Sequence, residues 1–520
     1  MNLPEDFETY TRQLFGDDLY STFRQALDEE PPVSIRVNPF KLQTSNFKLQ
    51  SKCNHKLQTS NFKLQSQCNH KLQTSNFKLQ IKEVQSVPWC PTGLYLTDRP
   101  AFTFDPLLHA GLYYVQEASS MFITEVARQL FHEPMMMLDL CAAPGGKTTA
   151  LRSVLPEGSL LFTNEPVKTR ASILKENVEK WGHPDVIVTN NYPRDYKKSK
   201  LTFDAILADV PCSGEGMFRK DPDTIKEWSR QNVEKCWQLQ RSIIEDIWPS
   251  LRPGGILIYS TCTYNAHEDE ENVKWIMEEL GAKSLTLNLP MAPSQGDGKS
   301  SSLNNGLPLQ SPWGPGYRFI PGITRGEGLY MAVLQKNGDA DSSAVAASCA
   351  SHHHNGIEKS KHQTNQKISH TNQLIGDFTY IEEKGFVRAI PTRWVDIYNK
   401  VKSSLHVIHA GVGIGTVKGK DIVPDASLAL SIALNKEAYP EAELTYEDAI
   451  KYLRKEAITL DASMPKGFTI VTYKGCPLGF VKNLGNRANN LYPQEWRIKS
   501  SYIPEGITSP LLQEGLGEAL

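Results

Sequence analysis

The sequence of 520 residues lacks several features that mark particular classes of protein. It has no apolar run of the roughly 18 to 20 residues that a membrane span needs, and no hydrophobic signal segment at its start. Its 9 cysteines are thinly spread, which argues against a disulfide framework. The net charge of only −2 means that an RNA-binding surface would need a local gathering of positive charge. We therefore expect a cytoplasmic protein without membrane contact, and the length predicts two or three domains.

A 15-residue repeat occupies part of the N-terminal region. It begins at Lys41, recurs at 56–70 and returns in part at 71–80. Near-identical copies are typical of a duplication within a tolerant surface loop, and unlike the diverged repeats of a solenoid. Each full copy holds a Cys-Asn-His triplet, which is not a common zinc spacing, so we expect no metal site there. A polar run at 337–373 has few apolar residues and is interpreted as a linker. It contains Cys349 and a histidine cluster, but a linker offers no preformed geometry for a metal ion.

Residues 135–281 alternate between strand-like and helix-like patterns. Strands are predicted at 135–140, 158–165, 185–190, 203–209 and 254–261, and helices at 147–155, 168–181, 223–250 and 267–280. Such alternation, with apolar strands buried on both faces, is typical of a doubly wound parallel sheet in a Rossmann-like α/β fold. Ligands bind such sheets at the carboxyl ends of the strands.

A glycine-rich turn follows the first of these strands. It reads Cys141-Ala142-Ala143-Pro144-Gly145-Gly146-Lys147 and opens a helix whose free backbone amides favour an anionic group. The turn fits neither the Walker loop nor the spaced glycines of dinucleotide enzymes. Glu165 ends the second strand, where a carboxylate can accept hydrogen bonds from ribose hydroxyls. Together the turn and the acid predict a nucleotide-like cofactor.

Two cysteines come just after the fourth and fifth strands. Cys212 follows Asp209 in the segment Asp-Val-Pro-Cys-Ser-Gly, and Cys262 lies in Tyr-Ser-Thr-Cys-Thr. A free cysteine is most often a small buried apolar residue. The polar, glycine-containing loop at Cys212 cannot supply a packed core, however, and hydroxyl side chains flank Cys262. We therefore expect both thiols to be catalytic.

These three motifs, in this order and spacing, resemble the Sun/Fmu-type RNA (cytosine-5-)methyltransferases, and among them the bacterial branch that methylates small-subunit ribosomal RNA. The likeness extends to 34–38, 114–121, 317–319 and 325–328, and 479–487 resembles the PUA-like RNA-binding module of the family. The predicted domains are an N-terminal RNA-contacting region (1–110) with the repeat insertion at 41–80, an S-adenosylmethionine-dependent methyltransferase core (111–336), the linker (337–373), and a C-terminal α+β region (374–520) that ends in the PUA-like domain.

The chemistry of cytosine explains why a thiol is needed. C5 is too electron-poor to attack a methyl sulfonium directly, so a thiolate must first add to C6. By the resemblance, Cys262 is this nucleophile, Cys212 helps to release the product, and Asp209 bonds the N3/N4 edge of cytosine. The implied cofactor is S-adenosylmethionine, with its methionine part at Cys141, Ala142, Ala143, Pro144, Gly145, Gly146 and Lys147, its ribose at Glu165, and a further contact at Asp209.

The sequence departs from the family after the third strand. The family commonly has an acidic residue near the adenine, whereas this chain has Asn190, Asn191 and Tyr192. Asparagine can still hydrogen-bond adenine, and tyrosine can stack on it.

The C-terminal region carries its own patterns. They predict a helix at 446–457, a hairpin over 467–481 that turns at Lys474 and Gly475, and an RNA-contacting polar stretch from Lys482 to Tyr492.

The predicted partner is RNA, most specifically small-subunit rRNA or its ribosomal particle, and we expect no stable protein partner. Two alternatives stay open: the same chemistry on transfer RNA, and a non-catalytic rRNA-binding or ribosome-assembly protein on the same fold. The intact pair of Cys212 and Cys262 argues against the second alternative, while the residues at 190–192 and the repeats argue for it.

Overall fold

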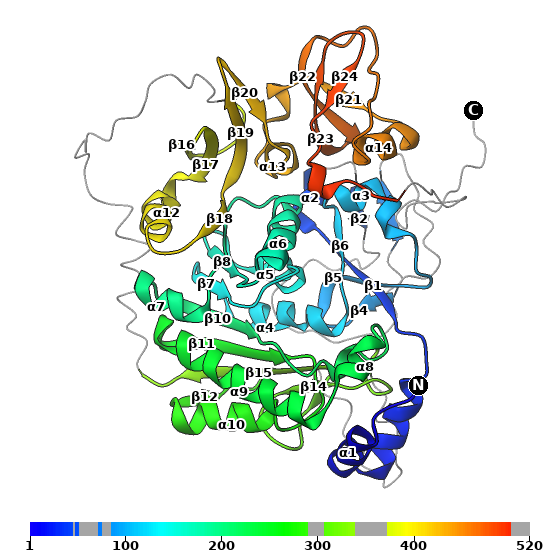
Figure 1. The fold of residues 1–520 in the computed structure, drawn as a ribbon, viewed down its shortest axis with the longest axis vertical. Coiled ribbons are helices and arrows are strands. Elements are labelled where there is room, and N and C mark those ends of the chain that lie inside the picture. The colour runs from blue at the N-terminus through cyan, green and yellow to red at the C-terminus, as the bar shows by residue number, and fades with distance from the viewer. Residues whose placement is uncertain (45–46, 51–70, 75–84, 290–305, 339–371, 501–520) are drawn as a thin grey trace.

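The computed structural model describes residues 1–44, 47–50, 71–74, 85–289, 306–338 and 372–500 (Figure 1). Most of the repeat segment at 41–80 and of the linker at 337–373 lies outside these residues, and so do the cysteine–histidine groups considered above. Within the described part of the chain, no helix combines the length and apolar character of a membrane span. The same residues hold no group of three or more His, Cys, Asp or Glu side chains that could bind a metal ion.

The N-terminal region combines a long helix with a small antiparallel sheet of order β4-β5-β1-β6. The helix, α1, bends at Gly16 and packs Phe7 edge-on against Phe218 and Trp228 of the central domain, with ring centroids 5.1 and 5.6 Å apart. The elements are α1 (Glu5–Ala26), β1 (Val33–Val37), α2 (Pro39–Thr44), β2 (Phe47–Gln50), β3 (Lys71–Thr74), β4 (Gln85–Val87), β5 (Cys90–Leu96), α3 (Pro106–His109), β6 (Tyr113–Val115) and α4 (Ile123–Leu130).

The central sheet has the order β13-β14-β15-β11-β10-β7-β8-β9-β18. Neighbouring strands from β9 to β11 are parallel, and β15 runs antiparallel to β11. This arrangement confirms the predicted Rossmann-like α/β fold. The strands are β7 (Met136–Asp139), β8 (Leu160–Asn164), β9 (Val186–Thr189), β10 (Phe203–Asp209), β11 (Leu251–Thr261), β12 (Ala282–Ser284), β13 (Leu309–Gln310), β14 (Tyr317–Phe319) and β15 (Leu329–Lys336).

Helices cover both faces of this sheet and form a buried core on each. One core contains Leu151 and Leu174, and the other contains Ile243 and Ile276. Burial on both faces explains why the strands read as continuous apolar runs. The helices are α5 (Gly146–Val154), α6 (Lys168–Trp181), α7 (Tyr196–Ser199), α8 (Asp223–Glu227), α9 (Arg230–Ile247) and α10 (Glu270–Glu279).

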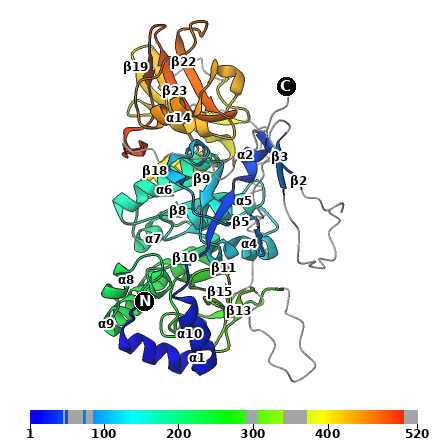
Figure 2. The same ribbon diagram turned by 90° about the vertical axis from the view of Figure 1, so that its right-hand side faces the viewer.

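The C-terminal region extends the central sheet and adds two small sheets, at the opposite end of the molecule from α1 (Figure 2). β18 pairs antiparallel with β9, so a strand from the second half of the chain forms one edge of the central sheet. The elements are β16 (Phe378–Glu383), β17 (Phe386–Pro391), α12 (Val395–Lys402), β18 (Val407–Ala410), β19 (Val412–Lys418), β20 (Asp421–Pro424), α13 (Ala426–Leu430), β21 (Glu441–Glu443), α14 (Tyr446–Leu453), β22 (Gly467–Tyr473), β23 (Cys476–Asn483) and β24 (Ala488–Asn490).

Several predicted elements match the structure closely. α6 and β10 have the expected bounds, and the hairpin of β22 and β23 turns at Lys474 and Gly475. The single helix predicted over 223–250 is wrong, because the chain leaves the helical conformation at Ser229 (φ −160°). The Ser229 side chain accepts a hydrogen bond from the Asn232 amide and caps the start of α9. α14 ends four residues earlier than predicted, at Leu453.

Candidate active site

The carboxyl ends of four neighbouring strands carry the predicted site residues. The glycine turn follows β7, Glu165 follows β8, Asp209 ends β10, and Cys262 follows β11. In the register of the sheet, Asp209 lies beside Ser260, two residues before Cys262. The fold therefore brings the residues that the sequence analysis singled out to one edge of the sheet.

The two thiols are in contact at this edge. The Sγ atoms of Cys212 and Cys262 are 3.0 Å apart, and the Cys262 amide donates to Cys212 Sγ at 3.2 Å. The pKa of Cys212 is raised well above its ordinary value, first by its hydrogen bond with Cys262, then by burial and by negative charge at Cys262 and Glu268. The raised pKa means that Cys212 keeps its proton in the free protein, in contact with the Cys262 sulfur.

The loops that carry the two cysteines are held together by direct hydrogen bonds. The Gly216 amide donates to the carbonyl oxygen of Cys262 at 2.9 Å, and Glu215 accepts from the Tyr264 amide at 2.8 Å. A Cβ atom at Gly216 would come within 2.5 Å of the Gly328 carbonyl oxygen, so only glycine permits this approach. Gly216 thus allows the Cys212 loop to lie against the segment that carries Cys262.

The glycine turn closes onto the same edge. Gly145, with φ 113° in the left-handed region, immediately precedes α5. The Lys147 ammonium donates to Asp209 Oδ2 at 2.9 Å. Burial disfavours the charge of Lys147, but the charge and hydrogen bond of Asp209 outweigh it, with help from Cys262 and Asp139, and raise the pKa of Lys147. Lys147 therefore stays charged and holds the Asp209 carboxylate beside the thiols.

An arginine of the N-terminal region stabilises the glycine turn and the start of α5 by hydrogen bonds. Arg36 on β1 is fully buried and donates to Gln116 Oε1 at 2.7 Å, to Thr149 Oγ1 at 2.5 Å and to the Gly146 carbonyl oxygen at 3.4 Å. Its guanidinium lies 4.4 Å from the ring centre of Trp181. Burial lowers its pKa to about 10. The family-like segments at 34–38 and 114–121 are thus parts of the support of the cofactor turn.

Glu165 retains an unsatisfied oxygen next to the turn. The side chain is 1% exposed, and its Oε1 accepts from the Val167 amide at 2.9 Å. Its Oε2 makes no hydrogen bond with the described residues, although Arg170 Nη1 lies 3.4 Å away. A buried acceptor of this kind at a strand end suits the donor hydroxyls of a ribose. The residue therefore fits the cofactor contact expected of it.

Asp139 is a candidate site residue that the sequence analysis missed. It ends β7, is 1% exposed, and accepts from Thr148 Oγ1 at 2.6 Å through Oδ2, while Oδ1 has no partner among the described residues. Burial raises its pKa to about 7, and the charges of Asp209 and Glu165 add to the shift. The sequence could have identified this residue, because it is an acid at the end of an apolar strand, just before the glycine turn. Its free oxygen suits the ammonium group of S-adenosylmethionine.

The residues after β9 are occupied with structural contacts. The Asn190 amide donates to the carbonyl oxygens of Glu165 and Pro166 at 2.7 and 2.9 Å. Asn191 Oδ1 accepts from the backbone of His406, which leads into β18. Tyr192 is 57% exposed. Two adenine contacts were considered for this segment, a hydrogen bond from asparagine and stacking by tyrosine. The Asn190 side-chain amide already donates to two backbone carbonyl oxygens, whereas the Tyr192 ring is accessible.

The C-terminal stretch proposed for RNA contact is only partly exposed. Tyr492 is 0% exposed and packs edge-on against Tyr452, with ring centroids 5.3 Å apart. The prediction of RNA contact is therefore wrong for Tyr492, because its ring lies in the core. Its short polar neighbours in the sequence gave no sign of this burial. Asn486 and Arg487 are exposed in the turn before β24.

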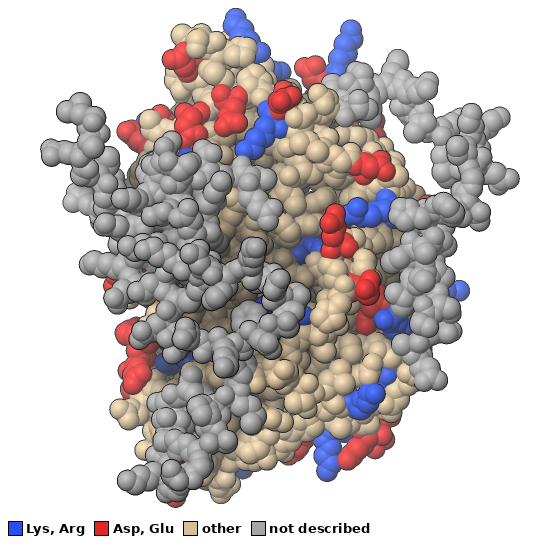
Figure 3. Space-filling view, turned by 180° about the vertical axis from the view of Figure 1, so that it is seen from behind, with Lys and Arg blue, Asp and Glu red and all other residues tan. Residues whose placement is uncertain are grey.

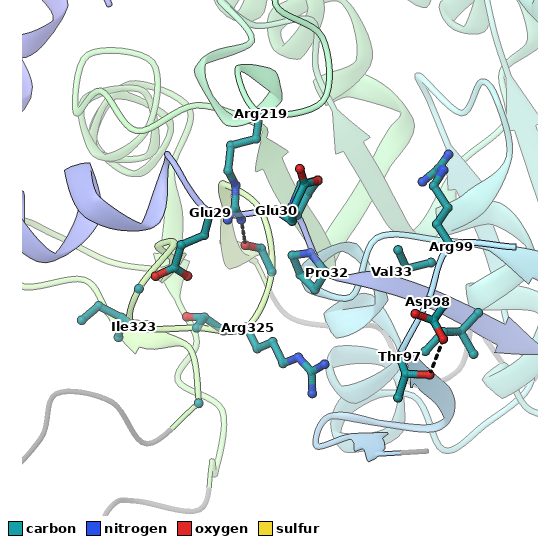
Figure 4. A pocket seen from close by; sticks show the side chains of 16 residues that line it. Glu29, Glu30, Pro32, Val33, Thr97, Asp98, Arg99, Arg219, Ile323 and Arg325 are labelled. Atoms are coloured by element: carbon teal, nitrogen blue, oxygen red, sulfur yellow. Dashed lines mark hydrogen bonds between the residues drawn. The ribbon is translucent and has the colours of Figure 1, made fainter. Parts of the chain in front are cut away.

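A pocket of about 720 Å³ lies apart from the thiols, between the end of α1, β5 and the segment before β15. Its lining includes Glu29, Glu30 and Asp98 as well as Arg99 and Arg325 (Figure 4). Figure 3 shows residues of both signs, lysine and arginine as well as acidic residues, on the part of the rear face that grey atoms leave visible. The pocket lining and this visible surface therefore both carry mixed charge.

Fold and site together define the class of protein. Parallel strands in the order β9-β8-β7-β10-β11, with an antiparallel β15 beside β11, form the fold of a Rossmann-like, S-adenosylmethionine-dependent methyltransferase. The glycine turn after β7 and the acid after β8 lie at the strand ends where such a fold binds its nucleotide.

Comparison with known proteins makes the assignment more specific. The family model of 16S rRNA methyltransferase RsmB/F matches residues 130–335. The models of the methyltransferase RsmF PUA domain and of the N-terminal domain of 16S rRNA methyltransferase RsmF match 439–498 and 61–118.

Individual relatives with similar sequences are also named as ribosomal RNA methyltransferases. The chain is 32% identical over 427 residues to ribosomal RNA small subunit methyltransferase F of Aliivibrio fischeri (strain MJ11), covering 79% of this chain and 85% of the relative. It is 26% identical over 507 residues to the protein of that name from Vibrio atlanticus, covering 95% and 97%. A crystal structure of a methyltransferase homolog from Pyrococcus horikoshii has 24% identity and a TM-score of 0.46, over 64% of this chain and 95% of that one.

The chain therefore belongs to the RsmB/F family of 16S rRNA methyltransferases, as the resemblance of its motifs predicted. Its cofactor is S-adenosylmethionine.

Proposed function

We propose that this protein transfers the methyl group of S-adenosylmethionine to C5 of a cytosine in small-subunit (16S) rRNA, in the cytoplasm. The contact between Cys212 and Cys262 Sγ atoms, 3.0 Å apart, carries the proposal, because a covalent route through C6 has a use for two adjacent thiols. The choice of RNA is supported by the family and by relatives whose names specify the small subunit. The match of 439–498 to a PUA domain supports RNA as the substrate class.

Cys262 acts as the nucleophile. Its sulfur adds to C6 of cytosine, which makes C5 electron-rich enough to take the methyl group. C5 then carries both a hydrogen and the methyl group. Loss of that proton to a base and cleavage of the bond between C6 and sulfur restore the aromatic ring and free the enzyme. Asp209, held by Lys147, offers its carboxylate to the N3/N4 edge of the cytosine during these steps.

Cys212 is the base that removes the C5 proton. In the free protein its pKa is raised first by the hydrogen bond with Cys262, and this keeps it protonated. Once Cys262 is bonded to C6, its sulfur is a neutral thioether and can no longer carry negative charge. The pKa of Cys212 then falls, and Cys212 releases its own proton to water. The thiolate so formed accepts the C5 proton, so the base becomes available only after the adduct has formed. The contact between the thiols thereby orders the two steps.

The residues around the glycine turn fit the cofactor. Residues 141–147 would hold its methionine part, Glu165 its ribose hydroxyls and Asp139 its ammonium group, and bound S-adenosylmethionine supplies an electrophilic methyl group. The support for these roles is the pair of buried carboxylate oxygens, on Glu165 and Asp139, that accept no hydrogen bond from the described residues.

The decisive experiment measures transfer of labelled methyl from S-adenosylmethionine to unmethylated small-subunit particles and to transfer RNA. We expect 5-methylcytosine in the 16S rRNA alone, and none with Cys262→Ala. Label in transfer RNA instead would assign the same chemistry to another substrate. Binding of RNA without transfer to either would indicate a non-catalytic protein and contradict the proposal.

The roles of the two thiols are separated by a second variant. Cys212→Ala should form the bond to C6 but fail to release the product, so a covalent complex of protein and RNA should accumulate on a denaturing gel. Cys212→Ala combined with Cys262→Ala should give no such complex. Absence of the complex in the single variant would refute the role of Cys212.

A further inference from the structure

The backbone on both sides of Cys212 is held by two fully buried side chains. Gln240 Nε2, on α9, donates to the Pro211 carbonyl oxygen at 2.9 Å. The Ser213 amide donates to Glu268 Oε2 at 3.0 Å. The residue before Cys212 and the residue after it are therefore each bound by one side chain.

These two side chains are also bonded to each other and to their surroundings. Gln240 Nε2 donates to Glu268 Oε2 at 2.7 Å, and Asn265 Nδ2 donates to Glu268 Oε1 at 2.7 Å. Gln240 Oε1 accepts from Asn272 Nδ2 at 2.7 Å and from the Tyr259 hydroxyl at 3.1 Å. Every polar atom of the pair thus has a partner, and a fully satisfied buried network is rigid.

The partners of this network tie the loop of Cys212 to the strand of Cys262. Tyr259 lies on β11, and Asn265 and Glu268 come three and six residues after Cys262 in the chain. A shift of the first loop would have to break bonds to the segment that carries the second thiol. The network therefore fixes the separation of the two sulfur atoms as well as the position of one loop.

We propose that Glu268 and Gln240 are positioning residues for product release, which hold Cys212 in place to act on the adduct that Cys262 forms. The proposal rests on the function proposed above and adds residues to which the reaction assigns no direct contact with cytosine or cofactor. Misplacement of a catalytic group by about 1 Å can cost on the order of 100-fold in rate. Loss of either side chain should therefore slow the step that needs Cys212 and spare the addition of Cys262.

Two variants test the network, one at Glu268 and one at Gln240. Glu268→Gln places an amide donor either against the two donors at Oε2, the Ser213 amide and Gln240 Nε2, or against Asn265 Nδ2 at Oε1. Gln240→Met removes both bonds that Gln240 Nε2 donates, at similar side-chain volume. For each we would measure kcat, the KM values for RNA and S-adenosylmethionine, and the fraction of enzyme bound covalently to RNA after denaturation. We expect kcat to fall on the order of 10- to 100-fold, with the KM values within about twofold and the covalent fraction approaching that of Cys212→Ala.

A matched control separates positioning from general destabilisation. Glu179→Gln removes a buried carboxylate of α6 whose Oε1 lies 3.0 Å from His409 Nδ1, with no part in the thiol loops. It should lower the melting temperature without raising the covalent fraction. If Glu268→Gln does not fold, Gln240→Met decides the question alone.

Two results would overturn the inference. Slow turnover of the variants without covalent complex, while Cys212→Ala accumulates it, would show that the network does not position Cys212 and would leave the proposed function standing. Absence of the complex in Cys212→Ala itself would remove the role of Cys212, and the inference with it.

Discussion

Raising the pH from 6 to 8 should strengthen the binding of S-adenosylmethionine about tenfold through Asp139. Burial raises the pKa of this carboxyl to about 7, so its ionised fraction grows from about one tenth at pH 6 to about nine tenths at pH 8. Only the ionised form offers full negative charge to the ammonium group of the cofactor. The groups that face Asp139 are Thr148, Lys147, Asp209 and Glu165, and the first two oppose the shift while the others add to it.

The stability of the protein without cofactor should respond to pH in the opposite sense. Because the pKa of Asp139 is higher in the folded state than its ordinary value of 3.8, the protonated form favours folding. That contribution is fully present below about pH 4 and is lost as the pH rises through about 7. The melting temperature should therefore fall between pH 6 and 8, and added S-adenosylmethionine should raise it most at pH 8.

Asp139→Asn is the control for both measurements. Asparagine keeps an acceptor for the Thr148 hydroxyl, which now bonds Asp139 Oδ2 at 2.6 Å, and removes the titration. Equilibrium binding of labelled S-adenosylmethionine at pH 6, 7 and 8 gives the affinities of both proteins, and any titration of the ligand itself affects the two equally. Parallel pH profiles for wild type and Asp139→Asn would refute the reasoning.

Three further substitutions test the supports of the site. Arg36→Lys cannot replace the guanidinium bonds and should cost about 2–4 kcal/mol, seen as a lower melting temperature and weaker cofactor binding. Arg318→Met leaves the buried carboxylates of Asp269 and Glu270, 3.3 and 2.5 Å from its guanidinium, unpaired and should cost on the order of 3–5 kcal/mol in a denaturant titration. Gly479→Ala would place a Cβ atom 2.2 Å from the Tyr452 hydroxyl, so RNA binding should be lost in a filter assay while cofactor binding is kept.

Local signals were enough to predict the central sheet and much of the candidate site. α6 has the predicted bounds because Gly182, with φ 84°, ends it in the left-handed conformation that glycine favours. The strand ends fix where the turn, Glu165 and the cysteines lie, since parallel strands deliver their carboxyl ends to one edge. Adjacency of Cys212 and Cys262 follows from the pairing of β10 with β11.

What the sequence could not show depends on contacts between distant segments. β18 pairs with β9 although the 217 residues of 190–406 lie between them, and its short polar-flanked pattern carries no mark of that partner. Tyr492 enters the core because Tyr452 and Trp496 surround it, although its neighbours in the sequence are polar. Arg36 reads as a surface charge until the fold places Gln116 and Thr149 around its guanidinium.

The pairing of β18 with β9 has a consequence for how the protein is made. β9 ends at Thr189 and β18 begins at Val407. During synthesis, β9 therefore has no partner on this side until the ribosome has added the residues of β18. At a synthesis rate of about 5–20 residues per second, this edge stays unpaired for roughly 10 to 45 s. During that time the open backbone groups of β9 can pair with other chains. A product that stops short of residue 407 never closes this edge, so the nascent chain is most prone to aggregate while its methyltransferase core is otherwise complete.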